Sequence, residues 1–131
     1  MKQYISSISL LVKDYDDAIE FYTKKLHFLI IEDTKLEENK RWVTISPRGN
    51  NSCHLLLAKA IGKEQLTAVG NQSGGRVFLV LYTDDFWRDH HEMSEQGVNF
   101  VRPPSKEVYG NVAVFEDLYG NLWDLIEPIK A

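Results

Sequence analysis

One order of predicted elements occurs twice in this chain of 131 residues, and this repeat restricts the possible folds more than any other feature of the sequence. Each copy is predicted to contain a strand, a helix and three further strands. In the first copy the elements span about residues 5–12, 15–25, 28–32, 41–46 and 53–58. In the second copy they span about residues 76–83, 86–96, 98–102, 108–115 and 122–127. A βαβββ order repeated after about seventy residues excludes most alternative topologies.

Capping residues and chain breakers support these bounds. Asp14 and Asp85 each precede a helical pattern and are typical N-cap residues, because a short acidic side chain accepts a bond from a free amide of the first turn. Gly97 is predicted to end the second helix. Pro103 and Pro104 are predicted to break the strand that precedes them, since proline has no amide hydrogen to donate.

The segment between the copies, about residues 60–75, contains four glycines and little hydrophobic periodicity. We interpret it as a linker with one helical turn near residues 64–68. The predicted organisation is therefore a single domain over residues 1–131, with module 1 at about 1–59, the linker at about 60–75 and module 2 at about 76–131.

The predicted fold class is α+β, with two βαβββ modules. A small curved mixed sheet with one helix cannot bury both of its faces, so two such sheets are expected to form a cleft from their concave faces. Clefts between structural units are common binding sites for small molecules.

The C-terminal stretch FEDLYGNLWDLIEP, residues 115–128, is predicted to form a strand, a tight turn and a second strand. Gly120 takes a positive φ at no steric cost, and Asn121 tolerates one. Asp124 is a carboxylate within an apolar strand, where an unpaired buried charge would be costly. In a strand Trp123 and Asp124 must face opposite ways. The function depends on whether Asp124 faces solvent or lines a cavity.

Composition restricts the partners and the compartment. The net charge is −4 and no basic cluster is present, which argues against nucleic acid as a partner. No apolar run approaches membrane-spanning length, and the start of the chain does not resemble a signal peptide. The single Cys53 excludes an internal disulfide and fits a reducing compartment. We expect a cytoplasmic protein without a nucleic-acid or membrane partner.

Three segments, VKDYDDAIEFYTKKLHF, TDDF and FEDLYGNLWDLIEP, resemble the vicinal oxygen chelate superfamily, also called the glyoxalase / bleomycin resistance protein / dioxygenase superfamily. The resemblance spans nearly the whole chain. One departure is His27, which stands where the family commonly has glycine. The resemblance implies paired βαβββ modules and usually a homodimer. Its enzymes hold a divalent metal through His, Gln or Glu ligands, whereas its binding proteins, such as those that sequester bleomycin, use the cleft without a metal.

The four metal-ligand positions that the resemblance implies do not carry a full ligand set. The first-strand positions are Ser7, a poor ligand when neutral, and Phe78, which cannot ligate. The last position of module 2 is Asp124. The fourth position falls within residues 53–56, where Cys53, His54 and Leu55 are alternatives. Because such metals need three or more protein ligands, we expect no metal and no cofactor.

Other residues indicate a pocket. Strand aromatics are expected mostly in the core, but an aromatic side chain at a former ligand position favours stacking or apolar contact with a ligand. The predicted cleft residues are Ser7, Trp42, His54, Phe78, Tyr109 and Asp124. Arg76 and Arg102 lie near strand ends and would reach an anionic ligand, although solvent exposure is the usual state of an arginine. The predicted catalytic residues are unknown.

The first functional hypothesis is a metal-independent, homodimeric protein of resistance or sequestering type that binds a small organic molecule in an aromatic-lined cleft. The alternative is a lyase, isomerase or dioxygenase that uses a divalent metal, or Asp124 or Glu116 as acid and base. A third alternative is an interaction module whose cleft is filled by its own side chains. The sequence does not identify a ligand, because one fold supports many pocket chemistries.

Overall fold

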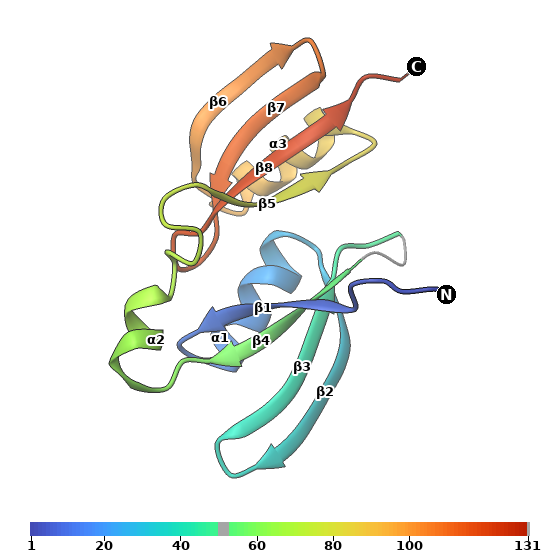
Figure 1. The fold of residues 1–131 in the computed structure, drawn as a ribbon. Coiled ribbons are helices and arrows are strands. Elements are labelled where there is room, and N and C mark those ends of the chain that lie inside the picture. Colours follow the sequence, from blue (N-terminus) through green and yellow to red (C-terminus); the bar gives the residue numbers. More distant parts are fainter. Residues whose placement is uncertain (50–52, 131) are drawn as a thin grey trace. The chain divides into compact units, whose positions relative to one another are not determined.

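The computed structural model describes residues 1–49 and 53–130 of the chain. Two compact units are present, Met1–Val69 (unit 1) and Gly70–Ala131 (unit 2). Each contains a four-stranded mixed sheet, with the order β1-β4-β3-β2 in unit 1 and β5-β8-β7-β6 in unit 2 (Figure 1). In both sheets the first strand of the unit pairs in parallel with the last, and the other pairs are antiparallel. The α+β fold class with mixed sheets is confirmed.

The elements of unit 1 follow the predicted order with altered bounds. They are β1 Ser7–Val12, α1 Tyr15–Glu20, the π-helix η1 Phe21–Lys25, β2 Leu29–Glu37, β3 Lys40–Ser46, β4 His54–Lys59 and α2 Gly62–Ala68. Asp14 caps α1 by accepting a hydrogen bond from the amide of Asp17 at 2.8 Å. The predicted single helix is divided, because its second half adopts the wider π-helical winding.

His27 follows this helix in the left-handed region, with φ of 60°. The chain therefore makes a turn at His27 with the positive φ that glycine holds at no steric cost, and histidine is one of the residues that tolerates it. The amide of Phe28 donates to the carbonyl of Tyr22 at 2.9 Å and closes the turn. The departure from the family pattern at this position has not abolished the turn.

Unit 2 contains β5 Val77–Tyr82, α3 Phe86–Glu95, β6 Phe100–Glu107, β7 Gly110–Glu116 and β8 Leu122–Pro128. The predicted end of the third strand at Pro103 and Pro104 is wrong, because β6 continues through both prolines to Glu107. β6 is the edge strand of its sheet, and its register with β7 shifts between Arg102 and Ser105. An edge position with a bulge lets proline remain in a strand without losing a ladder hydrogen bond.

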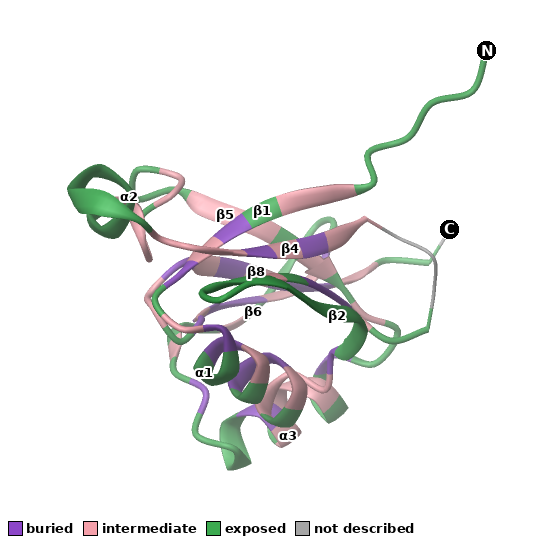
Figure 2. Ribbon diagram, turned by 90° about the horizontal axis from the view of Figure 1, so that it is seen from below, coloured by how far each residue is buried: buried purple, intermediate pink, exposed green. Residues whose placement is uncertain are grey.

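The core of each unit lies between its sheet and its helix, and buried residues fall on the strands and on α1 and α3 (Figure 2). In unit 1, α1 packs on β3 and β4, and the fully buried side chains include Leu10, Val43 and Leu57. In contrast, every residue of β2 is exposed, and so is most of α2. No helix in residues 1–49 and 53–130 is long and apolar enough to span a bilayer.

An aromatic row forms the core of unit 2. The strand register aligns Phe100, Phe115 and Trp123 across three neighbouring strands on one face of the sheet. Phe115 and Trp123 stack with ring centroids 5.8 Å apart. His90 of α3 packs on this row, with its ring centroid 4.2 Å from that of Phe100. The burial of His90 lowers the pKa of its imidazole, and the neighbouring His91 lowers it further.

The turn between β7 and β8 is organised by the buried carboxylate of Asp117, which is 4% exposed. One oxygen accepts hydrogen bonds from the amides of Tyr119, Gly120 and Asn121 at 2.9 to 3.0 Å. The other accepts from the side-chain amide of Asn121 at 3.0 Å. Only Gly120 of the turn takes a positive φ, at 102°, so Asn121 serves as a hydrogen-bonding residue and not as the left-handed one.

Gly70 lies against this turn. It has φ of +78°, and a Cβ at this position would overlap the backbone carbonyl of Tyr119. Gly74 has a similar φ of +68° with open space around it. A comparison of alanine substitutions at Gly70 and Gly74 therefore separates the cost of a left-handed conformation from the cost of a steric clash.

We predict that Gly70→Ala lowers the free energy of unfolding by at least about 2 kcal/mol more than Gly74→Ala. Both substitutions carry the cost of a positive φ, about 1 kcal/mol, but only the first forces a side chain into a backbone oxygen that cannot move easily. Chemical denaturation of both variants measures the difference. Equal losses for the two variants would show that the turn does not pack against Gly70 as described.

We also predict that protonation of His90 destabilises unit 2. Because its pKa is lower in the folded chain than in the unfolded chain, the unfolded chain binds the proton more readily below about pH 6.5. Stability is then fully present above this pH and falls as the pH decreases. Replacing His90 by phenylalanine should reduce the slope of stability against pH between 7 and 5.

Equilibrium denaturation at several pH values provides the measurement. His54→Gln, which removes a histidine from unit 1, is measured in parallel as the control. An unchanged slope in the His90→Phe variant would contradict the prediction.

Candidate functional site

A hollow of about 360 Å³ lies on the face of unit 2 opposite α3. The side chains that line it come from all four strands of the sheet and include Val77, Arg102, Pro103, Tyr109, Val114 and Asp124. Its volume lies within the range of small-molecule pockets. The hollow is made by one unit alone.

The strand register determines where the polar groups of this hollow lie. Asp124 of β8 is paired with Val114 of β7, and Val114 is paired with Arg102 of β6. Paired residues of neighbouring strands share a face, so Arg102, Val114 and Asp124 form a row across the sheet. Trp123 points to the opposite face, where it joins the aromatic core. Asp124 therefore lines a cavity.

The carboxylate of Asp124 is half-buried, and its electrostatic environment combines two opposing effects. Burial raises the pKa of Asp124 above its ordinary value, and the positive charge of Arg102 lowers it by a smaller amount. Among the residues that the structure describes, neither side chain has a hydrogen bond or an ion pair. Both groups are available to a ligand.

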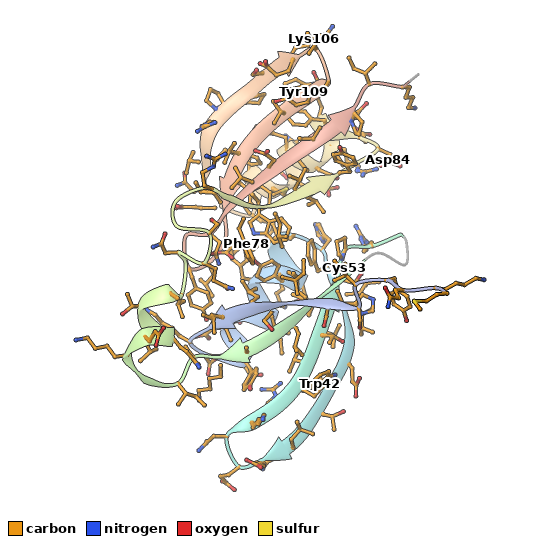
Figure 3. All side chains as sticks on the ribbon, in the orientation of Figure 1. Trp42, Cys53, Phe78, Asp84, Lys106 and Tyr109 are labelled. Atoms are coloured by element: carbon orange, nitrogen blue, oxygen red, sulfur yellow. The ribbon has the colours of Figure 1, made fainter. Side chains whose placement is uncertain are left out.

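The predicted residues of unit 2 are only partly brought together. Tyr109 and Asp124 both line the hollow. Phe78 does not, and Figure 3 shows Tyr109 and Phe78 at opposite ends of the unit. The register between β5 and β8 shifts between Val77 and Leu79, so Phe78 falls in a bulge and Val77 lines the hollow instead.

The predicted residues of unit 1 are Ser7, Trp42 and His54. Ser7 of β1 is the direct pairing partner of His54 of β4, so their side chains lie on the same face. Trp42 lies on β3, 42% exposed, and is labelled in Figure 3. Leu55 and Leu57 alternate with His54 and are buried. This alternation shows that His54 and Leu56 share the face away from the core.

The internal registers of the two units identify the fourth ligand position that the sequence left open. Asp124 pairs with Val114 and Val80, where Val80 lies two residues after Phe78. In unit 1 the corresponding pairs join Leu56 to Thr44 and to Ser9, which lies two residues after Ser7. The counterpart of Asp124 is therefore Leu56, and not Cys53, His54 or Leu55.

The residues at these four positions do not fit a divalent metal. They are a carboxylate at Asp124, a neutral hydroxyl at Ser7 and hydrocarbon side chains at Leu56 and Phe78. Metal sites of this kind need at least three protein ligands. No group of three His, Cys, Asp or Glu side chains that could hold a metal ion is found within the described part of the chain.

Arg102 is not among the residues predicted for the cleft, although its position near a strand end suggests contact with an anion. Its sequence neighbours gave no sign that it shares a row with Asp124, because the two residues lie on strands that are separated by β7. Alternation within β6 would have been a weak signal, since the two prolines and the bulge disturb its period.

Comparisons with known proteins agree with this architecture. Residues 4–125 match the model of the Glyoxalase/Bleomycin resistance protein/Dioxygenase superfamily. An uncharacterized protein of Shewanella frigidimarina is 60% identical over 128 residues, which are 97% of this chain and 95% of that protein.

Two solved structures are similar over nearly their whole length. The crystal structure of UcmS2 superposes with a TM-score of 0.84 at 28% identity, covering 97% of this chain and 99% of that one. The structure of TnmS3, an antibiotic binding protein from Streptomyces sp. CB03234, has a TM-score of 0.78 at 26% identity and covers 98% of both chains. The chain belongs to the glyoxalase/bleomycin resistance protein/dioxygenase superfamily.

Proposed function

We propose that this chain is a metal-independent binding protein of resistance or sequestering type, which holds a small organic molecule and performs no chemistry on it. The observation that carries the proposal is the position of Asp124. It is the one carboxylate among the four ligand positions of the family, and it lines a hollow that also contains the aromatic ring of Tyr109 and apolar side chains such as Val77, Pro103 and Val114. Such a group is suited to orient a ligand, because a few precisely placed polar groups fix the orientation of a molecule in a pocket.

Similarity to an antibiotic binding protein supports the proposal that this chain is a binding protein. TnmS3 is described as such a protein, and it is similar to this chain over 98% of both lengths. Fold similarity alone does not transfer a ligand. The chemistry of Asp124 and its surroundings is the main support for a binding function, and the similarity to TnmS3 adds to it.

The proposed assembly is a homodimer in the cytoplasm. Several large apolar side chains are exposed in the single chain, including Leu29, Ile30 and Ile31, which are 47% to 49% exposed on the edge strand β2. Edge strands with apolar side chains are usually covered in the native assembly. Cys53, the single cysteine, fits a reducing compartment.

Catalysis is the second candidate function. The raised pKa of Asp124 is suited to a general acid or base, because such groups work best when they titrate nearer neutral pH. Glu116 offers a second carboxylate on β7, where it accepts a hydrogen bond from the side-chain amide of Asn99 at 2.9 Å. A lyase, isomerase or dioxygenase would require one of these groups, or a metal, to act on the bound molecule.

We predict that small aromatic molecules stabilise the purified protein against heat and that divalent metals do not. A ligand that binds only the folded chain must raise its melting temperature, and at a concentration of 100 Kd the gain is about 2.7 kcal/mol. A thermal-shift screen with Mn²⁺, Ni²⁺, Zn²⁺ and a library of aromatic acids, phenols and amines measures both effects. Metal analysis of the untreated protein should find less than one divalent ion per chain.

Asp124→Ala distinguishes the two candidate functions. If the protein only binds its ligand, this variant should bind the best ligand of the screen with lower affinity than the wild type. The same ligand should be recovered unchanged after incubation with the wild type. A stoichiometric metal ion, or conversion of the ligand that is abolished in Asp124→Ala, would favour the enzyme and contradict the proposal.

The proposed homodimer predicts a mass of twice 15.1 kDa in solution. The exposed apolar side chains should be covered in the assembly, and burial of apolar surface at about 25 cal/mol per Å² drives such association. Size-exclusion chromatography with light scattering, at chain concentrations from about 1 to 100 µM, provides the measurement. A monomer at the highest concentration would contradict the prediction.

A further inference from the structure

The row of Arg102, Val114 and Asp124 points to the chemical class of the ligand. We propose that the hollow of unit 2 selects a planar amphoteric molecule with an acidic group at one end, held by Arg102, and a hydroxyl or amine at the other end, held by Asp124. This inference rests on the proposed binding function and adds the polarity and the spacing of the ligand to it.

Arg102 and Asp124 are spaced to hold opposite ends of one small molecule. Arg102 and Asp124 lie on one face of the sheet with one strand between them, and Val114 of that strand lies between them in the row. Neighbouring strands are about 4.8 Å apart, so the backbones at Arg102 and Asp124 are about 10 Å apart. No ion pair joins their side chains among the residues described. The space between the two charges is floored by Val114, which is 4% exposed.

A ligand that covers the hollow must compensate for the water that the charged side chains lose. A ligand in the hollow removes water from Arg102 and Asp124, because both line it. Glu107 is the third charged residue of the lining, and its carboxylate already accepts a hydrogen bond from the hydroxyl of Ser105. A charged group that loses water without gaining a hydrogen bond destabilises the complex. A ligand with one polar end would satisfy one residue and leave the other without a partner. A ligand with an acidic end and a donor end satisfies both.

Arg102 and Asp124 differ in the direction of the hydrogen bonds that they form. The guanidinium of Arg102 only donates hydrogen bonds, and its planar fork matches a carboxylate. The carboxylate of Asp124, when ionised, only accepts hydrogen bonds and therefore requires a hydroxyl or amine. The orientation of the ligand along the row is fixed by this difference.

The apolar side chains of the hollow favour a flat ligand. Pro103 and Tyr109 contribute flat apolar surfaces to the walls, and Tyr109 is 53% exposed. An aromatic ring that covers Tyr109 buries this surface and stacks on it at little cost in side-chain entropy. The floor residue Val114 is likewise apolar. A planar aromatic molecule fits these walls better than a flexible polar one.

Three matched probes test the inference on the full chain. The first is 6-hydroxy-2-naphthoate, which has both polar ends on one rigid ring system. The second is 2-naphthoate, which has only the acidic end, and the third is 2-naphthol, which has only the donor end. Isothermal titration calorimetry at pH 7.5 gives the Kd of each probe.

The wild-type protein should bind 6-hydroxy-2-naphthoate at least about tenfold more tightly than either other probe, because hydrogen bonds to charged groups contribute the most. Arg102→Gln should weaken the binding of the two naphthoates at least about tenfold and leave the affinity for 2-naphthol unchanged. Asp124→Asn should weaken the binding of the two hydroxyl-bearing probes and leave the affinity for 2-naphthoate unchanged. Arg76→Gln removes an arginine that does not line the hollow and should change none of the three.

Three results would overturn the inference. They are equal binding of the three probes, the same loss for every probe in both variants, and no binding of 6-hydroxy-2-naphthoate at millimolar concentration. If the thermal-shift library still yields a ligand of another class, the binding function stands and only this inference fails. If no organic molecule binds, the proposed function fails as well. If Arg102→Gln does not fold, Arg102→Lys replaces it. This variant keeps the positive charge but not the planar fork of the guanidinium. It should weaken the binding of both naphthoates relative to that of 2-naphthol.

Discussion

The candidate site depends on the hydrogen bonds that the buried carboxylate of Asp117 accepts. This carboxylate holds the amides of Tyr119, Gly120 and Asn121 and the side chain of Asn121, so the turn between β7 and β8 has one defined length. The length of the turn sets the pairing that follows it, from Glu116 with Leu122 onward. In a strand a shift by one residue would exchange the two faces. A different turn would place Trp123 in the hollow and Asp124 in the core.

β8 therefore divides two environments that require opposite chemistry. On one face Trp123 stacks on Phe115 and continues the aromatic row that His90 covers. On the other face Asp124 lies between Val114 and Val80 in the hollow. The core face provides the apolar burial that stabilises unit 2, and this rigid support leaves the opposite face free to carry a half-buried charge. Binding groups on strands that a packed core supports are held more precisely than groups on loops.

The two units share a topology but differ at the strand position that Asp124 occupies in unit 2. Leu56 in unit 1 is the counterpart of Asp124 in unit 2, as the pairs with Thr44 and Val114 indicate. The same strand position thus carries a hydrocarbon in one unit and a carboxylate in the other. A metal site needs ligands at several such positions, whereas a pocket for an organic molecule needs only one or two polar groups among apolar walls. The loss of ligands at Leu56 and Phe78 is therefore compatible with a pocket that binds organic molecules.

The sequence by itself determined the order of the elements, the N-caps at Asp14 and Asp85, and the opposite faces of Trp123 and Asp124. These features follow from local rules, because caps, turns and strand alternation depend on residues only a few positions apart. The sequence did not determine that β6 continues through Pro103 and Pro104, that a bulge displaces Phe78 from the hollow, or that Arg102 shares a row with Asp124. Each of these depends on pairing between strands that are distant in sequence, and a bulge shifts that pairing without a reliable local signal. The tertiary structure alone decided which charged groups face one another across Val114, and so which chemistry the hollow offers a ligand.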